Sequence, residues 1–145
     1  LGQRFARGND DHLQRLRTRA GDRILFDGFA ESRDAYWHRL SQIDVVISTA
    51  DHEFFGVGIC EAIDAGAIPL LPNRLAYPEI LAYVTGPQAA RYLYDSLDEA
   101  AELLESWLWD PAATLPPRLD MRAYHWSHLA PRYDNLLSDL VKHHG

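Results

Sequence analysis

The sequence predicts an α/β fold in which a parallel sheet carries helices on both faces, and three observations lead to this prediction. A β-branched apolar run, Val45 to Ile47, reads as a buried strand and is followed by a polar turn with two glycines. A helical pattern at 57–65 comes next and stops at Gly66, a residue typical of helix C-termini. A second buried strand, 68–71, then ends before Pro72. Strand, turn, helix and strand in this order make a βαβ unit with a right-handed crossover.

The flanking segments are assigned from local patterns. Before the βαβ unit we expect the tail of a strand at 1–5, a helix at 11–20 capped by Asn9 or Asp10, a strand at 23–26, and a helix at 32–42 capped by Ser32. After it we expect a helix at 77–83 with Pro78 at its first position, a strand at 91–94, a helix at 98–109 capped by Asp98, and a final helix within 121–143 whose first turn contains Pro131.

Length and composition restrict the class of protein. The 145 residues suit one domain, and no apolar run approaches the length of a membrane span. One cysteine, Cys60, suits a reducing cytoplasm, and the start of the chain lacks the apolar core of a signal peptide. The net charge of −7 argues against a free-standing nucleic-acid-binding protein. The eight arginines of residues 1–40 are the part of the chain most suited to contact RNA.

The turn of the βαβ unit carries the candidate chemistry. Gly56 and Gly58 allow a ligand to approach the backbone where the amides of a helix N-terminus are unpaired, which is an anion site. Glu53 and Glu61 frame this position from the loop and from the helix. Carboxylates accept hydrogen bonds from hydroxyl groups, so an anion site between two of them fits a nucleotide-sugar.

These residues resemble a known family. The Glu53-x7-Glu61 spacing, with glycines inside it and Gly66-Ala-Ile-Pro69 after it, resembles the signature of retaining GT-B glycosyltransferases of family 4. Residues 48–57 (STADHEFFGV), 75–80 (LAYPEI) and 92–94 (YLY) are similar to the tRNA-queuosine mannosyltransferase subgroup. The resemblance implies a Rossmann-like domain, the C-terminal half of a GT-B fold, with its ligand at the carboxyl ends of the strands.

The resemblance also implies roles for particular residues. Glu61 would bind the ribose hydroxyls, and Glu53 would contact the donor sugar as the catalytic residue. The backbone at Phe55, Gly56, Val57 and Gly58 would hold the sugar or the distal phosphate. The resemblance adds four further donor-binding residues: His52, Glu79, and, beside the nucleotide base, Gly28 and Phe29.

The implied activity is transfer of mannose from GDP-mannose to the queuosine base of a tRNA, in the cytoplasm and away from membranes, with no cofactor. Residues 1–145 would form the single nucleotide-sugar-binding domain, while the acceptor domain, the first strand and the cationic pair for the phosphates would precede Leu1. The tRNA would then bind mainly through that preceding domain, and this chain alone would be inactive and bind nucleotide weakly. The final helix would pack across the boundary between the two domains.

Two alternatives remain open. One is a GT-B transferase or epimerase that uses another nucleotide-sugar with a lipid, glycan or small-molecule acceptor. The other is a non-catalytic Rossmann-like binding module in which Glu53 and Glu61 are surface acids. No metal site is expected, because Asp51, His52 and Glu53 are adjacent on an extended loop and point in different directions. His125 and His128 are interpreted as boundary or surface residues, and Cys60 as part of the core.

Overall fold

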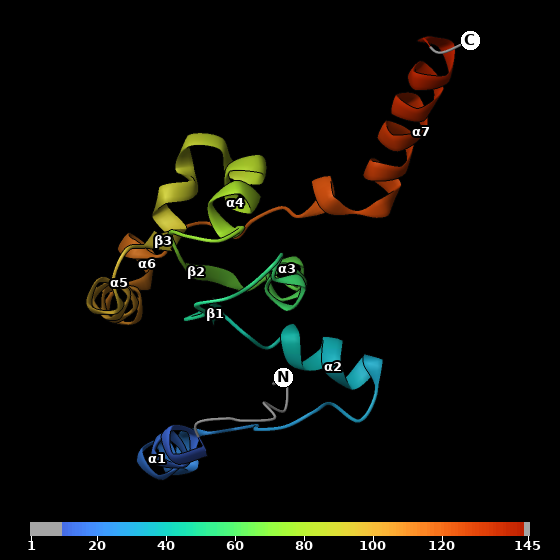
Figure 1. Ribbon diagram of the computed structural model, residues 1–145. Helices are drawn as coiled ribbons and strands as arrows, with labels where there is room; N and C mark the ends of the chain where they lie inside the picture. Colours follow the sequence, from blue (N-terminus) through green and yellow to red (C-terminus); the bar gives the residue numbers. More distant parts are fainter. Residues whose placement is uncertain (1–9, 144–145) are drawn as a thin grey trace. The chain divides into compact units, whose positions relative to one another are not determined.

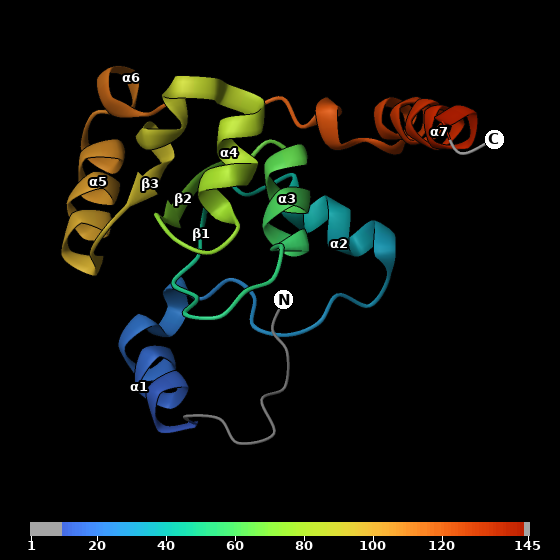
Figure 2. The same ribbon diagram turned by 45° about the horizontal axis from the view of Figure 1, so that its top comes forward.

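A computed structural model describes residues 10–143, with the side chains of residues 14–142. The predicted strand tail at 1–5 and the capping side chains of Asn9 and Asp10 lie outside this range. The chain divides between His38 and Arg39 into two units, and each is described by itself. Figures 1 and 2 show the order of their elements along the chain.

The N-terminal unit contains helix α1 (Asp10–Ala20), the 3-10 turn η1 (Gly21–Arg23) and most of helix α2 (Arg33–Leu40). The predicted cap of α2 is confirmed, because Ser32 Oγ accepts a hydrogen bond from the Ala35 amide at 3.1 Å. The predicted helix at 11–20 is confirmed as α1. An ion pair between Arg17 and Asp27 joins α1 to the following loop and lowers the pKa of the Asp27 carboxyl.

The strand predicted at 23–26 is wrong. Arg23 ends the 3-10 turn, residues 24–27 have no regular structure, and the side chain of Leu25 is 95 % exposed. A strand needs a neighbour for its amide and carbonyl groups, and the described part of this unit contains none.

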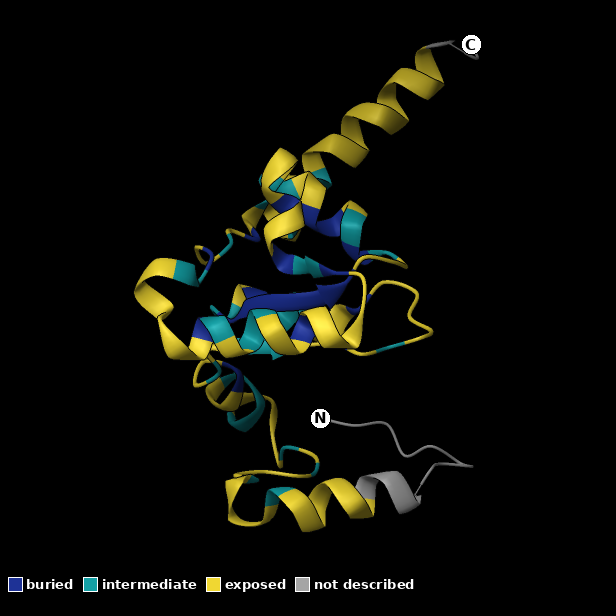
Figure 3. Cartoon of the chain, turned by 90° about the vertical axis from the view of Figure 1, so that its left-hand side faces the viewer, coloured by how far each residue is buried: buried dark blue, intermediate teal, exposed yellow. Residues whose placement is uncertain are grey.

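The C-terminal unit is built on a parallel sheet in the order β1 (Val45–Ile47), β2 (Ile68–Pro72), β3 (Leu93–Tyr94). Val45 pairs with Ile68, and Leu71 with Leu93. Every residue of β2 is buried, and Figure 3 shows this strand in the dark blue of buried residues. The predicted α/β class and parallel βαβ unit are therefore confirmed for this unit.

The other elements of this unit, in chain order, are α3 (Val57–Asp64), α4 (Tyr77–Thr85), the 3-10 helix η2 (Gly86–Tyr92), α5 (Leu97–Trp109), α6 (Pro111–Thr114), η3 (Arg122–Tyr124) and α7 (Trp126–His143). Helix α3 packs on β1 and β2, η2 on β2, and α5 on β3. The core combines aliphatic residues of β2 and α4 with large aromatic ones, among them Tyr77, Tyr92, Tyr94 and Trp107.

The end of α3 follows the predicted pattern. Gly66 has a positive φ of 108°, its amide bonds to the Ile63 carbonyl, and the Ala67 amide bonds to the Ala62 carbonyl. These two hydrogen bonds form a Schellman motif, in which glycine is favoured because side chains disfavour positive φ. The motif turns the chain directly into β2.

Two strand predictions need correction. β1 is not a buried strand: its first two residues are half-buried, and Ile47 is 42 % exposed because β1 pairs only with β2 among the described strands. The strand predicted at 91–94 is shorter, since Arg91 and Tyr92 belong to η2. The preceding Pro87 cannot donate a backbone hydrogen bond, which suits it to the start of such a 3-10 segment.

Helix starts also differ from the predictions. Ser96, not Asp98, caps α5: its hydroxyl accepts the Glu99 amide at 3.1 Å, and the Glu99 carboxylate accepts the Asp95 amide at 2.7 Å. Pro131 lies in the second turn of α7 rather than the first, where it removes a backbone hydrogen-bond donor from the helix. From Pro131 to Lys142 all side chains of α7 are exposed, including its apolar residues Leu136, Leu137, Leu140 and Val141.

Candidate functional site

The carboxyl ends of the three parallel strands meet at one edge of the sheet. Hydrogen bonds join the residues that follow the strands: the Asn73 amide donates to the Tyr94 carbonyl at 2.8 Å, and the Asn73 side chain donates to Asp95 at 3.0 Å. The longest of the segments leaving this edge runs from Ser48 to Gly56, hereafter loop 48–56, and leads into α3. This edge is where α/β folds commonly bind ligands.

Two buried tyrosines hold the start of loop 48–56. The Ser48 hydroxyl lies 2.9 Å from the Tyr77 hydroxyl, and the Tyr94 hydroxyl donates to the Ser48 carbonyl at 2.7 Å. Burial raises the pKa of Tyr94, so its hydroxyl stays protonated and remains a donor. Ser48 is itself buried, and such pairing removes the cost of placing polar groups there.

The end of loop 48–56 lies against the same tyrosine. Gly56 is buried with φ of 76°, and a Cβ placed on it would lie 2.9 Å from Cε1 of Tyr77. Tyr77 belongs to α4 and is 1 % exposed, so it contacts both ends of the loop from the core. The position of the α3 N-terminus therefore depends on how Tyr77 packs.

The N-terminus of α3, residues 55–58, is called the helix tip below. The Gly56 carbonyl accepts the amides of Ile59 and Cys60 at 2.9 and 3.0 Å, which starts the helix. The amides of Val57 and Gly58 have no carbonyl to reach within an α-helix, and both residues are exposed. A Cβ on Gly58 would meet nothing within 4 Å, so the backbone there is open to a ligand. The tip has the donors and the dipole of an anion site.

Glu53 lies beside the helix tip. Its Cγ would be 3.6 Å from a Cβ on Gly56, and its Oε1 accepts the amide of Phe54 at 3.0 Å. The side chain is exposed, so its second oxygen can accept a hydroxyl donor. His52, the preceding residue, is exposed as well.

Glu61 is half-buried and lines a groove of about 280 Å³ between α3 and residues 121–129. Phe55, Val57, Tyr124 and His125 also line this groove. Glu79 lines a different groove of about 630 Å³, which also contains Phe55. The structure thus brings together Glu53, Phe55, Gly56, Val57 and Gly58 at the tip. Glu61 and Glu79 line two different grooves that share Phe55.

Gly28 and Phe29 belong to the N-terminal unit and are described there alone. Gly28 has φ of 156°, and Phe29 is 66 % exposed in the loop before α2. Their role at the nucleotide base stays a prediction.

Arg74 was not singled out from the sequence. It follows β2, donates to the Ala50 carbonyl through Nε and Nη2, and pairs with Asp51 at 3.0 Å. The next residue, Leu75, has a positive φ of 62°, a conformation uncommon for a bulky side chain. The sequence signal for it was an arginine two residues after a buried strand, opposite the acidic loop that follows the parallel neighbour of that strand. Its contacts orient loop 48–56.

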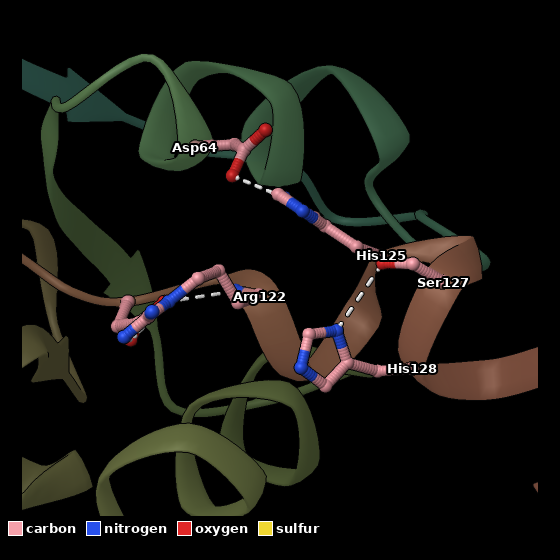
Figure 4. A network of polar contacts seen from close by, with 6 residues as sticks. Asp64, Arg122, His125, Ser127 and His128 are labelled. Atoms are coloured by element: carbon pink, nitrogen blue, oxygen red, sulfur yellow. Dashed lines mark hydrogen bonds and ion pairs between the residues drawn. The ribbon is translucent and has the colours of Figure 1, made fainter.

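A polar network joins α3 to the segment before α7 (Figure 4). Nε2 of His125 lies 2.7 Å from Oδ1 of Asp64, at the end of α3, and Arg122 forms an ion pair with Asp120. Arg122 lowers the pKa of the Asp120 carboxyl through its hydrogen bonds. The His125–Asp64 contact holds the segment after η3 against α3, and residues of both segments line the 280 Å³ groove.

Cys60 is half-buried between Glu61 and the core. Burial, and secondly the charge of Glu61, raise the pKa of its thiol to about 11. At neutral pH the group is therefore a protonated thiol and a poor nucleophile, in line with its prediction as a core residue.

A tRNA-queuosine alpha-mannosyltransferase of Drosophila melanogaster is 43 % identical to this chain over 70 residues, which cover 48 % of this chain and 18 % of the relative. No protein-family model matches the chain, and no solved structure matches it. None of the described helices is long and apolar enough to cross a bilayer. The chain is thus related to a glycosyltransferase over about half its length.

Proposed function

We propose that this chain is the donor-binding part of a retaining glycosyltransferase that moves mannose from GDP-mannose to the queuosine base of a tRNA. The observation that carries the proposal is the 43 % identity with the Drosophila tRNA-queuosine alpha-mannosyltransferase. The parallel sheet with a helix tip at its carboxyl edge supports it, because this arrangement suits a nucleotide diphosphate.

Different residues at and beside the helix tip contact different parts of the donor. The amides of Val57 and Gly58 donate hydrogen bonds to the anionic end of the diphosphate, where they stabilise the charge that grows as the sugar–phosphate bond breaks. Glu61 binds the ribose hydroxyls and Glu53 binds the hydroxyls of the sugar. In the transfer, the acceptor oxygen forms a bond to the anomeric carbon while the bond from that carbon to the diphosphate oxygen breaks. GDP leaves with the bonding electrons, and the proton of the acceptor hydroxyl passes to the departing diphosphate oxygen.

Tyr77 and Arg74 act as positioning residues in this proposal. Tyr77 contacts both ends of loop 48–56, and Arg74 holds its middle through Ala50 and Asp51. A preordered loop lowers the entropy lost when the donor binds.

The test is NMR titration of the ¹⁵N-labelled chain with GDP-mannose, UDP-glucose and ADP, since this method detects weak binding. GDP-mannose is expected to shift the amides of residues 55–58 most. Glu61→Ala is expected to weaken its binding by about 1–3 kcal/mol, the scale for unpaired hydroxyl partners. Glu105→Ala, which removes an exposed carboxylate from α5, is the matched control and should change nothing.

The outcomes separate the alternatives. Stronger shifts with UDP-glucose would favour a transferase or epimerase with another donor. No shift at the tip with any nucleotide would favour a non-catalytic binding module and refute the proposal.

A further inference from the structure

Five of the eleven residues that line the 630 Å³ groove are aromatic, and they come from three separate segments. Loop 48–56 provides Phe54 and Phe55, α4 provides Tyr83, and the C-terminal segment provides Tyr124 and Tyr133. We call this the aromatic groove. Its size falls within the range of small-molecule sites.

One wall of the aromatic groove is a continuous series of packed rings. Phe55 meets Tyr124 edge-on at 6.1 Å between ring centroids, Tyr124 lies 5.0 Å from Tyr83, and the Arg132 guanidinium lies 5.8 Å from the centre of the Tyr83 ring. Arg132 also donates a hydrogen bond to the Tyr83 hydroxyl. These contacts order the wall before any ligand arrives.

Phe54 is different, because its side chain is fully exposed while it lines the same groove. A fully exposed phenylalanine buries no apolar surface that would stabilise the fold, and its ring is available to stack on a ligand. Exposed aromatic rings beside an arginine are how proteins commonly hold unpaired bases of RNA loops.

The charged groups in the groove restrict the chemical class of the ligand further. Glu79 is exposed there and is an acceptor-only anion, whereas Arg132 is already held against Tyr83. The chain as a whole carries −7, so attraction for phosphates is not the main source of affinity. A flat heterocycle with hydrogen-bond donors or a positive charge is the complementary ligand. The base of queuosine is such a heterocycle: a guanine analogue that carries a diol-bearing group through a secondary amine, which is protonated at neutral pH.

We propose that the aromatic groove binds the acceptor base, with the ring stacked on Phe54 and the cationic side chain facing Glu79. This inference rests on the proposed function and extends it to the second substrate. Phe55 supports the connection, because its ring lies in the groove while its backbone belongs to the helix tip. In this view Glu79 contacts the acceptor rather than the donor.

The test measures fluorescence anisotropy of the chain with two RNA hairpins, identical except for queuosine or guanosine in the loop. The unaltered chain should prefer the queuosine hairpin. Phe54→Ala should weaken binding of both hairpins about 10-fold, the scale for loss of one stacked base. Glu79→Gln should remove the preference and leave the affinity for the guanosine hairpin unchanged.

Trp109→Ala is the matched control, because Trp109 is 90 % exposed and lies at the end of α5, away from the groove. It should leave both affinities unchanged. The affinity should also fall little between low and moderate salt, in contrast to binding through phosphates.

Three results would overturn the inference: no binding of either hairpin, an equal effect of Phe54→Ala and Trp109→Ala, or a steep salt dependence without an effect of Phe54→Ala. The GDP-mannose titration is independent of these measurements. Tip shifts with GDP-mannose together with any of the three results would leave the proposed function standing and reject the acceptor site alone.

Discussion

The replacement of Gly56 by alanine tests the structural basis of the helix tip. Gly56 combines a positive φ of 76° with a buried position against Tyr77. An alanine there would have to adopt a left-handed conformation and would place its methyl group 2.9 Å from Cε1 of Tyr77. Neither cost is avoidable by moving a flexible surface side chain, since Tyr77 is 1 % exposed.

The magnitude follows from two contributions. The left-handed conformation costs a non-glycine residue about 1–2 kcal/mol. Displacing the Tyr77 ring strains a packed core and disturbs its hydrogen bond to Ser48, which adds about 1–2 kcal/mol. Gly56→Ala should therefore lower the free energy of unfolding by about 2–4 kcal/mol.

Urea denaturation followed by circular dichroism measures this change, and Gly58→Ala is the matched control. Gly58 lies two residues further on in α3, and a Cβ there meets nothing within 4 Å. Alanine is the better helix former, so Gly58→Ala should stabilise the protein by up to about 1 kcal/mol. The reasoning is refuted if Gly56→Ala changes the free energy of unfolding by less than about 0.5 kcal/mol, or if the control destabilises equally.

Three further predictions concern the same region. Tyr94→Phe leaves the buried Ser48 carbonyl without its hydrogen-bond donor and should lower the free energy of unfolding, measured by urea denaturation, by about 1–3 kcal/mol. An unchanged midpoint would contradict the role given to this hydrogen bond. Gly58→Ala should keep the fold yet weaken GDP-mannose binding in the NMR titration, because a helical Cβ points toward the helix N-terminus; equal affinity would remove Gly58 from the donor site. The pKa of Cys60 is raised from 9.0 to about 11, so the fraction of thiolate at pH 8 falls about 100-fold. Iodoacetamide should therefore modify the folded chain about 100 times more slowly than the urea-unfolded chain, as followed by mass spectrometry. The reaction of the folded chain should become faster as the pH rises toward 11. Similar rates in both states would show that the thiol is not shielded.

The elements best predicted from the sequence are those with strong local signals. Gly66 ends α3 and Ser32 caps α2 as expected, because capping depends on a few neighbouring residues. The strand at 23–26 failed because its apolar pattern says nothing about whether a partner strand lies beside it. For the same reason the burial of β1 was overestimated: a run of valine and isoleucine is compatible with both central and edge positions.

The sequence alone determined the parallel βαβ unit of the C-terminal unit and the glycines at the start of α3, since both depend on short-range periodicity and backbone freedom. Tertiary structure alone decided that Tyr77 contacts both ends of loop 48–56 and that Phe55, Tyr83 and Tyr124 form one wall. These contacts join residues from about 20 to 70 positions apart, and side-chain packing in three dimensions, not local pattern, selects them.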